Sequence, residues 1–416
     1  MLEVTVLGGG VAAAKLCDAL ADHGGLDRPL RIRLAARRAE RVEGIARHAS
    51  ERVGRRRPAW RVAASPTVTD AIRGADIILN LVRVGGLAAR AWDEHFPEAF
   101  GQVGDEGLGL GGVANAWRSL PVMDRLAGTI AREAPDALVL NMAAPLGVTT
   151  RCFLEAGVRT FGLCELPGLT RDRWRRLLPT GGNAALHYCG LNHLGWFWPA
   201  DAAGAAILDS AVRTGEVDGE ILERFGAAPL HYYATLFDTA AAARLRSTRR
   251  PGRARELADL SEVIFASMIA QPGGEIPQIA ARPTPWFDRV VAPVIDAVAG
   301  PGRFSDFLNL PNDGAWLAGS PAGIVVEVPA DIAGGQVGRQ PQPPPPRPVS
   351  EFLLACAQSE DLNYRAAAAR DRRMLVRAIA ALPTSLPAAR MDEIVARIIA
   401  GERFAETPDP QEPPAS

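Results

Sequence analysis

Short apolar runs alternate with segments of helical periodicity over the first 165 residues. Residues 76–82 and 138–142 are nearly continuous apolar runs, as expected of parallel strands that are buried on both faces. Residues 2–7, 30–35 and 160–163 are also predicted to be strands, and residues 11–23 carry apolar positions at helical spacing before Gly24 and Gly25. Strands that alternate with helices predict an α/β fold whose N-terminal part, residues 1–165, is a Rossmann-like, doubly wound parallel sheet.

The second half mixes helical and strand patterns. We expect residues 166–404 to form an α+β substrate, metal and oligomerisation domain that closes over the carboxyl edge of the sheet. Residues 341–348 are rich in proline and are predicted to be an extended connector. Residues 405–416 are polar and proline-rich and are predicted to be a disordered tail. The predicted helices are 203–214, 217–225, 253–271, 285–298, 354–381 and 391–401, and the predicted strands are 303–310 and 323–329.

Composition narrows the class of protein. The chain has 416 residues, 22% of them charged, with a net charge of −1, so no nucleic-acid partner is indicated. No run of about 18 apolar residues is present, so we expect no membrane span. The first predicted strand begins at residue 2, which leaves no room for a signal peptide. Five scattered cysteines suit a reducing compartment, and a cytoplasmic location is therefore predicted.

A glycine-rich turn follows the first predicted strand and opens the first predicted helix. Its pattern is Gly8-x-Gly10-x-x-Ala13, the context that a dinucleotide-binding fingerprint requires. Gly8 permits the tight turn, Gly10 lets the backbone approach a pyrophosphate, and Ala13 keeps helix and strand close. Val11 and Ala12 open the helix, whose N-terminus would face the phosphates. A purely structural turn is the alternative interpretation.

The choice between NAD and NADP depends on the end of the second strand. An acidic residue usually stands there and binds the ribose hydroxyls of NAD. This chain has Arg37 and Arg38 instead, which favours the 2′-phosphate of NADP slightly. The alternative, that both arginines begin a solvated helix, has nearly equal weight.

Two short apolar sequence motifs each end in a potential metal ligand. They are Gly162-Leu163-Cys164 and Gly190-Leu191-Asn192-His193. A thiolate and an imidazole together suit a borderline divalent ion. An isolated cysteine, in contrast, is most often an inert core residue.

Many short sequence motifs, found in the same order along the chain, make it resemble glycoside hydrolase family 4. This is a family of NAD- and Mn²⁺-dependent glycosidases and phospho-glycosidases. The motifs are the glycine turn, the two motifs above, and Leu81-Val82-Arg83-Val84-Gly85-Gly86, Asp93-Glu94, Gly101-Gln102-Val103-Gly104-Asp105-Glu106, Asn141-Met142-Ala143-Ala144-Pro145, Pro229 with Tyr232, Asn309-Leu310-Pro311-Asn312 and Val325-Val326-Glu327-Val328-Pro329. The resemblance implies a lactate/malate dehydrogenase-like architecture and a homodimer or homotetramer. It also implies hydrolysis of a small-molecule glycoside by oxidation at C3, metal-assisted deprotonation at C2 and elimination at C1, an exception to the usual two-carboxylate scheme.

Site residues follow from the same resemblance. It implies that Cys164 and His193 bind the metal and that Tyr232 is the catalytic base, with Tyr233 as the alternative. For Arg83 the alternative to a sugar contact is an ion pair with Asp93 or Glu94. The remaining implied contacts are Val82 with the cofactor and Arg83, Glu106, Asn141 and Asn192 with the sugar.

Departures from the family pattern gather around the expected sugar position. Glu165 follows the metal cysteine, Ala144 replaces an asparagine, and Asp105 replaces a glutamine. A polar site that loses a partner rejects its former ligand, so we expect a changed substrate. The added negative charge of Glu165 and Asp105 favours an uncharged, amino or cationic glycoside over a phosphorylated one. Two other functions stay open: a sugar or cyclitol oxidoreductase or epimerase, and a non-catalytic nucleotide-binding protein.

Overall fold

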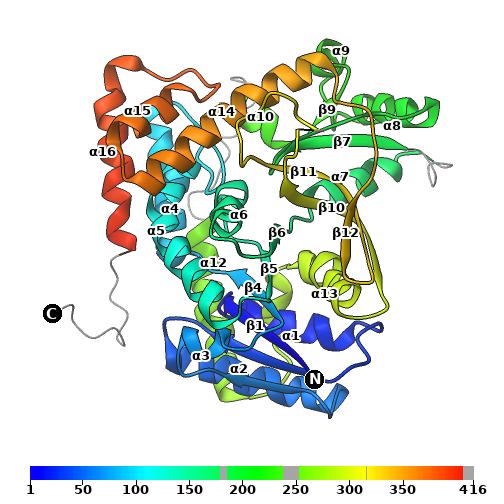
Figure 1. Ribbon diagram of the computed structural model, residues 1–416, viewed down its shortest axis with the longest axis vertical. Helices are drawn as coiled ribbons and strands as arrows, with labels where there is room; N and C mark the ends of the chain where they lie inside the picture. The colour runs from blue at the N-terminus through cyan, green and yellow to red at the C-terminus, as the bar shows by residue number, and fades with distance from the viewer. Residues whose placement is uncertain (179–184, 238–252, 315, 406–416) are drawn as a thin grey trace.

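Six parallel strands form the N-terminal half of the sheet. The computed structural model describes residues 1–178, 185–237, 253–314 and 316–405 (Figure 1). The strands lie in the order β3-β2-β1-β4-β5-β6. This order confirms the predicted doubly wound sheet, and the order reverses between β1 and β4. Their bounds are β1 (Leu2–Gly8), β2 (Leu30–Ala35), β3 (Arg61–Ala64), β4 (Ile77–Leu81), β5 (Leu138–Asn141) and β6 (Thr160–Gly162).

Helices cover both faces of these strands, which is why the strands are apolar almost throughout. Val4, Val6, Ile78, Leu79 and Val139 are at most 2% exposed. The helices of this half are α1 (Ala12–Asp22), α2 (Ala39–Arg56), α3 (Val68–Ile72), α4 (Gly86–His95), η1 (Phe96–Phe100), α5 (Gly109–Glu133) and α6 (Leu146–Glu155).

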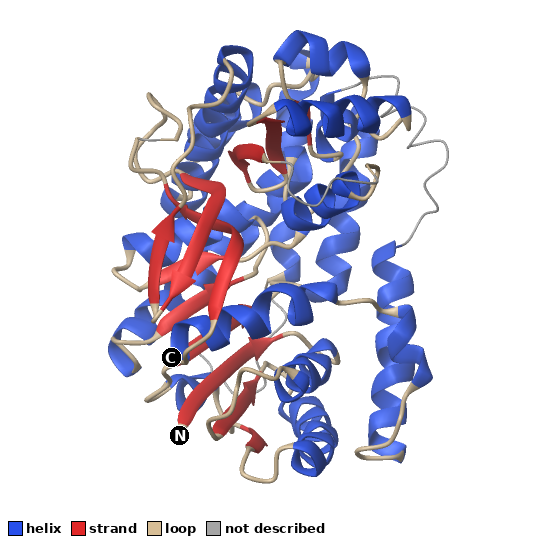
Figure 2. Cartoon of the chain, turned by 90° about the vertical axis from the view of Figure 1, so that its right-hand side faces the viewer, coloured by secondary structure: helices blue, strands red, loops and turns tan. Residues whose placement is uncertain are grey.

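The same sheet continues into the second half of the chain. Strand β10 (Arg303–Pro311) pairs antiparallel with β6, and β11 (Val325–Ala333) pairs antiparallel with β10. Next along the sheet come β7 (Leu186–Leu191), β8 (Leu194–Pro199) and β9 (Ala228–Pro229), while β12 (Gln336–Arg339) pairs with β11. Figure 2 shows the strands as one twisted band with helices on both sides. The β7–β8 hairpin was not among the predicted strands.

Helices of the second half mostly follow the predicted periodicities. The helix predicted at 354–381 is two helices, because the chain reverses at Arg370, whose φ is +55°. The helix predicted at 285–298 begins as a π-helical turn. The proline-rich connector ends at 346, since Arg347 and Pro348 form the first turn of α14. The described elements are α7 (Leu166–Arg175), α8 (Ala202–Arg213), α9 (Gly219–Phe225), α10 (Tyr232–Phe237), α12 (Arg253–Ala270), η3 (Pro277–Ala281), η4 (Phe287–Val291), α13 (Ala292–Ala299), α14 (Arg347–Ala369), α15 (Arg372–Ala380), η5 (Ala388–Arg390), α16 (Met391–Ala400) and η6 (Gly401–Phe404).

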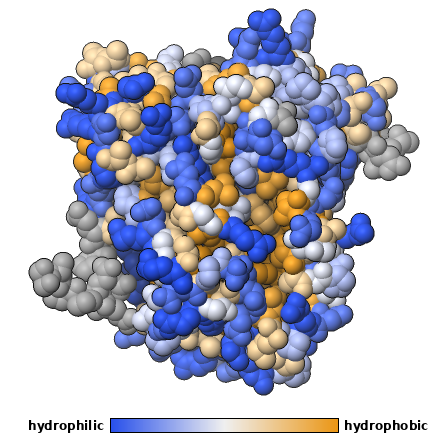
Figure 3. All heavy atoms as spheres, in the orientation of Figure 1, coloured by the Kyte–Doolittle hydropathy of each residue, from blue (hydrophilic) through white to orange (hydrophobic). Residues whose placement is uncertain are grey.

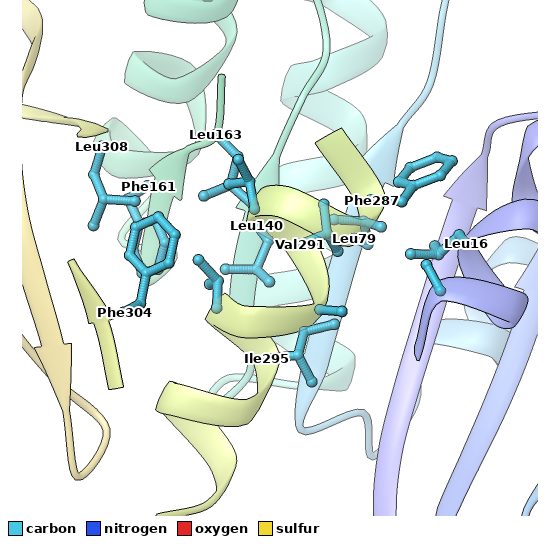
Figure 4. Close-up of a cluster of buried hydrophobic side chains, with 14 of the residues drawn as sticks. Leu16, Leu79, Leu140, Phe161, Leu163, Phe287, Val291, Ile295, Phe304 and Leu308 are labelled. Carbon is cyan, nitrogen blue, oxygen red and sulfur yellow. The ribbon is translucent and has the colours of Figure 1, made fainter. Parts of the chain in front are cut away.

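One buried cluster joins the two halves. Leu16, Leu79, Leu140 and Phe161 come from α1, β4, β5 and β6, and Ile295 of α13 packs with them (Figure 4). In the space-filling view, polar residues dominate the face, and apolar residues show mainly in its centre (Figure 3). Within the described ranges no helix is both long and apolar enough to cross a membrane. The predicted tail at 405–416 lies outside the described residues except for Ala405.

Candidate active site

The glycine turn lies where the order of the parallel strands reverses, the usual ligand position in such sheets. Gly8 ends β1 with φ +82°, and a Cβ there would lie 2.8 Å from the carbonyl oxygen of Leu81. The turn therefore fits tightly against the end of β4, next to Val82. A Cβ on Gly10 would meet no atom within 4 Å, so the outer side of the turn is open. No side chain caps α1, whose N-terminal dipole faces this opening.

Arg37 and Arg38 follow β2 and are both exposed. The strand ends at Ala35, with no carboxylate at the position that normally binds ribose. The neighbouring Arg41 donates a 2.7 Å hydrogen bond to Glu262 of α12 and lowers the pKa of that carboxyl, to which the charge of Arg38 also contributes. Part of the positive charge near this position is therefore matched by a carboxylate of α12.

Cys164 and His193 come from opposite halves of the sheet and meet around Asn192 and Tyr232. Cys164 lies two residues beyond β6, and His193 occupies the β7–β8 turn with φ +67°. Asn192 lies near Cys164, because it partly offsets the rise that burial causes in the pKa of that thiol. The ring of Tyr232 stacks on His193, with centroids 4.5 Å apart and planes 6° apart. The structure therefore brings the two expected metal ligands and the expected base into one place.

The chemistry of this pair fits a metal. The Nδ1 atom of His193 is buried and has no hydrogen-bond partner within the part of the chain that the structure describes. Burial lowers the pKa of His193 to about 4, so the ring is neutral, as a metal ligand must be. Burial, together with the charges of Glu327 and Glu165, raises the pKa of the Cys164 thiol well above its usual range. Among the described residues, no group of three or more His, Cys, Asp or Glu side chains is arranged to hold a metal.

Two arginines and two glutamates form a cluster beside the metal pair. Arg83 donates to both oxygens of Glu106, at 2.7 and 2.8 Å. Arg90 lies 3.3 Å from Glu106 and donates to Glu94 at 2.7 Å. Burial alone would raise the pKa of Glu106, but Arg83 and Arg90 lower it to about 2. Arg83 is thus ion-paired, and the expected alternative partner was wrong: it pairs with Glu106 and not with Asp93 or Glu94.

Asp93 belongs to a buried frame that the sequence reasoning missed. Its two oxygens accept from Arg118 at 3.0 and 2.6 Å, and both side chains are at most 1% exposed. Arg118 also donates to the Asn115 side chain at 3.0 Å. Asn115 donates to the backbone oxygens of Glu106 at 2.8 Å and Ala144 at 3.0 Å. The frame therefore ties two loops of the site together. The sequence feature that could have indicated this cluster is the presence of two polar residues, Asn115 and Arg118, within an apolar stretch of α5.

Asn141 does not face the sugar site, which corrects the expected contact with substrate. The residue is fully buried, and its Nδ2 donates to Thr149 and Thr150, both at 2.9 Å. Its Oδ1 accepts from Asn80 at 2.9 Å and from the backbone of Ala143 at 3.2 Å. The amide is saturated by the protein, so it supports the loop after β5.

Tyr233 is also displaced from the expected alternative role. Its ring packs against Trp196, Phe225, Phe237 and Phe352, with centroids 4.9 to 5.8 Å away. Tyr232 is the tyrosine beside the metal pair. Burial, Asp105 and Cys164 raise the pKa of Tyr232 when no cation is present.

The fold and the site are those of a nucleotide-binding enzyme in which a Cys–His pair could hold a metal. The model of the family 4 glycosyl hydrolases matches residues 3–179, and the model of that family's C-terminal domain matches residues 188–385. The chain belongs to this family, as its sequence motifs indicated.

Curated relatives match shorter segments. A maltose-6′-phosphate glucosidase from Bacillus subtilis is 29% identical over 162 residues, 38% of this chain and 36% of that protein. An alpha-galacturonidase from the same species is 29% identical over 154 residues, 34% of each chain. These matches thus span about a third of the relatives' lengths.

Solved structures match the fold over nearly the whole chain. The 6-phospho-beta-glucosidase of Thermotoga maritima, solved with manganese, NAD⁺ and glucose-6-phosphate, has a TM-score of 0.82 at 20% identity, covering 97% of this chain and 98% of that one. A malate dehydrogenase from Plasmodium falciparum has a TM-score of 0.50 at 12% identity, covering 89% and 99%. The expected dehydrogenase-like architecture is therefore confirmed.

Proposed function

We propose that the protein is a glycosidase that works by oxidation and elimination, with a nicotinamide dinucleotide and a divalent metal. The observation that carries this proposal is the meeting of Cys164, His193 and Tyr232. The glycine turn supplies the other half of the site, at the switch point of the same sheet. Direct hydrolysis by two carboxylates needs neither a nucleotide turn nor a thiol–imidazole pair.

The bound groups supply the reactive steps. When bound, a nicotinamide would accept a hydride from sugar C3 and later return it, and a metal would polarise the C3 oxygen so that the C2 proton can be removed, the C1 substituent can leave and water can add in its place. The protein's own contribution is to hold and orient. Cys164 and His193 would hold the metal, and Gly8 to Ala13 would hold the pyrophosphate.

Tyr232 is assigned as the base that removes the C2 proton. Its ring lies against His193, and of the two candidate tyrosines it is the one placed beside the metal pair. An ordinary phenol has a pKa of about 10, so this role needs a nearby cation to lower it. A metal held by Cys164 and His193 would supply that cation. Asn192, which lies near Cys164, orients the site from the opposite side.

The resident nucleotide is proposed to be NAD. Structures of related enzymes contain NAD, including the Thermotoga maritima protein and a 6-phospho-alpha-glucosidase from gut microorganisms. The exposed Arg37 and Arg38 keep NADP as the second candidate. Titration of the protein with NADH and NADPH, followed by energy transfer from tryptophan, distinguishes the two.

We further propose that the sugar carries no phosphate. The Nε–Nη2 edge of Arg83 is used by Glu106, and Arg90 is shared between Glu106 and Glu94. A phosphate at these positions would have to compete with a carboxylate that the arginines hold in its ionised form. Asp105 and Glu165 add further negative charge. The names of several relatives favour the opposite conclusion, because they are 6-phospho-glycosidases, whereas the alpha-galacturonidases are named for a sugar acid.

A paired substrate panel tests this proposal. Aryl glycosides are offered with and without a 6-phosphate, in the presence of NAD⁺ and Mn²⁺, and kcat/KM is compared within each pair. The unphosphorylated member should be preferred. The variant Glu106→Gln frees the charge of Arg83 and should shift the ratio towards the phosphorylated member. A 6-phospho-glycoside as the best substrate of the unaltered enzyme would contradict the proposed substrate class.

A further inference from the structure

A row of paired residues crosses the sheet where its parallel and antiparallel halves join. Gly162 of β6 is paired with Asn309 of β10, Asn309 with Glu327 of β11, and Glu327 with Gly190 of β7. The two central members are polar yet at most 1% exposed. The two outer members are glycines, and each lies two or three residues before a metal ligand, Cys164 or His193. The row thus connects the two strands that carry the ligands.

Glu327 is a buried carboxylate held by neutral donors. It accepts from the Tyr188 hydroxyl at 2.5 Å and from the side-chain amides of Asn192 and Asn309, both at 2.9 Å. Among the described residues no arginine, lysine or histidine forms an ion pair with it. Burial raises the pKa of Glu327, because a buried charge without a counter-ion is costly. A role other than stabilisation would account for a carboxylate at this position.

Asn192 connects Glu327 to the two expected metal ligands, Cys164 and His193. Its amide nitrogen has two hydrogens, and it donates to Glu327. The same side chain lies near Cys164, since it partly offsets the rise that burial causes in the pKa of that thiol. His193 is the next residue in the tight β7–β8 turn, so the orientation of Asn192 also constrains the peptide that carries His193.

Glycines next to the row leave room for these side chains. A Cβ on Gly195, which pairs with Gly190, would lie 1.8 Å from the Tyr188 hydroxyl. A Cβ on Gly162 would lie 2.8 Å from the Cβ of Asn309. Relieving the first clash would require Tyr188 to move, and relieving the second would require Asn309 to move. Glycine at both positions therefore preserves the arrangement around Glu327.

We propose that Glu327 is a positioning residue that sets the relative placement of Cys164 and His193 through Asn192. The carboxylate fixes the Asn192 amide, and that amide fixes the sulfur on one side and the histidine turn on the other. This inference rests on the proposed function for the assignment of Cys164 and His193 as metal ligands.

The test is metal binding by the full-length protein with NAD⁺ present. Free Mn²⁺ is measured by electron paramagnetic resonance, and the thiolate-to-metal charge-transfer band is recorded with Co²⁺. The variant Glu327→Gln keeps the side-chain volume but loses the charge and one acceptor. We expect Mn²⁺ affinity to fall about 10- to 100-fold and the Co²⁺ band to shift, with NADH affinity unchanged.

A matched control is Glu155→Gln. Glu155 also accepts a tyrosine hydroxyl, that of Tyr364 at 2.8 Å, but it lies at the C-terminal end of α6. Its Mn²⁺ affinity should stay at the wild-type value. Should Glu327→Gln not fold, Tyr188→Phe removes one donor to Glu327 at nearly constant volume and should weaken Mn²⁺ binding by a smaller factor.

The outcomes separate this inference from the proposed function. Stoichiometric Mn²⁺ binding by the wild type, lost in Cys164→Ser and unchanged in both Glu327→Gln and Tyr188→Phe, would overturn the positioning role alone. Absence of Mn²⁺ binding by the wild type would instead overturn the metal site and, with it, this inference. Weakened binding with a shifted Co²⁺ band and intact NADH affinity would support it.

Discussion

Replacing Asp93 with asparagine should destabilise the protein strongly, although the change removes no volume. Asp93 and Arg118 form a two-bond ion pair in which the side chains are 0% and 1% exposed. The variant leaves the Arg118 guanidinium buried beside a neutral amide, and breaking such a pair costs about 3–5 kcal/mol. Arg118 would keep its bonds to the Val84 carbonyl and to Asn115, so we expect the lower end, about 3 kcal/mol. Urea-induced unfolding at pH 7, followed by circular dichroism, measures this loss.

The control is Glu393→Gln, which removes the charge from an ion pair of the same kind on the surface. Glu393 and its partner Arg390 are 44% and 40% exposed, so solvent screens their attraction. No clear change in unfolding free energy is expected. In the surviving folded fraction of Asp93→Asn, the loops of Glu106 and Ala144 should also loosen, because Arg118, which holds Asn115, loses its carboxylate partner. Equal stability of Asp93→Asn and Glu393→Gln would refute the reasoning.

Two further predictions concern Glu360 and Gly8. Burial raises the pKa of Glu360 to about 7, so its ionisation weakens folding as pH rises from its unfolded value, 4.5, through 7. Glu360→Gln should therefore raise the unfolding free energy at pH 8 by up to about 3 kcal/mol and change little at pH 4.5; equal effects at the two pH values would contradict this. Gly8→Ala places a methyl group 2.8 Å from the Leu81 carbonyl oxygen at φ +82°, a strain of about 1–3 kcal/mol. NADH affinity should fall tenfold or more by fluorescence titration, with Gly24→Ala, in open space, as the unaffected control.

The parallel half of the fold could be predicted because its physics is local. Buried parallel strands are continuously apolar, and the glycine turn marks the start of the first helix. The β7–β8 hairpin could not be found in this way, because β8 is buried on both faces and its pattern lacks the alternation of a half-exposed strand. Its turn also places His193 at a positive φ, which its residue type does not announce.

The site residues also divide into those that could be predicted from the sequence and those that could not. Cys164 and His193 could be proposed from their sequence motifs, because the chemistry of metal ligands restricts the residue types. The partner of Arg83 could not, since the sequence offered Asp93 and Glu94 nearby and the fold supplies Glu106. The role of Glu327 depends on strand register, which places residues far apart in the chain side by side.

Solvent exchange at sugar C2 tests the central proposal most directly. A glycoside identified by the substrate panel is hydrolysed in deuterium oxide with NAD⁺ and Mn²⁺, and the released sugar is analysed by nuclear magnetic resonance. Oxidation and elimination require the C2 proton to be removed and replaced from solvent, so the account predicts deuterium at C2 in the product. Complete hydrolysis with hydrogen retained at C2 would mean direct displacement at C1 and would contradict the account.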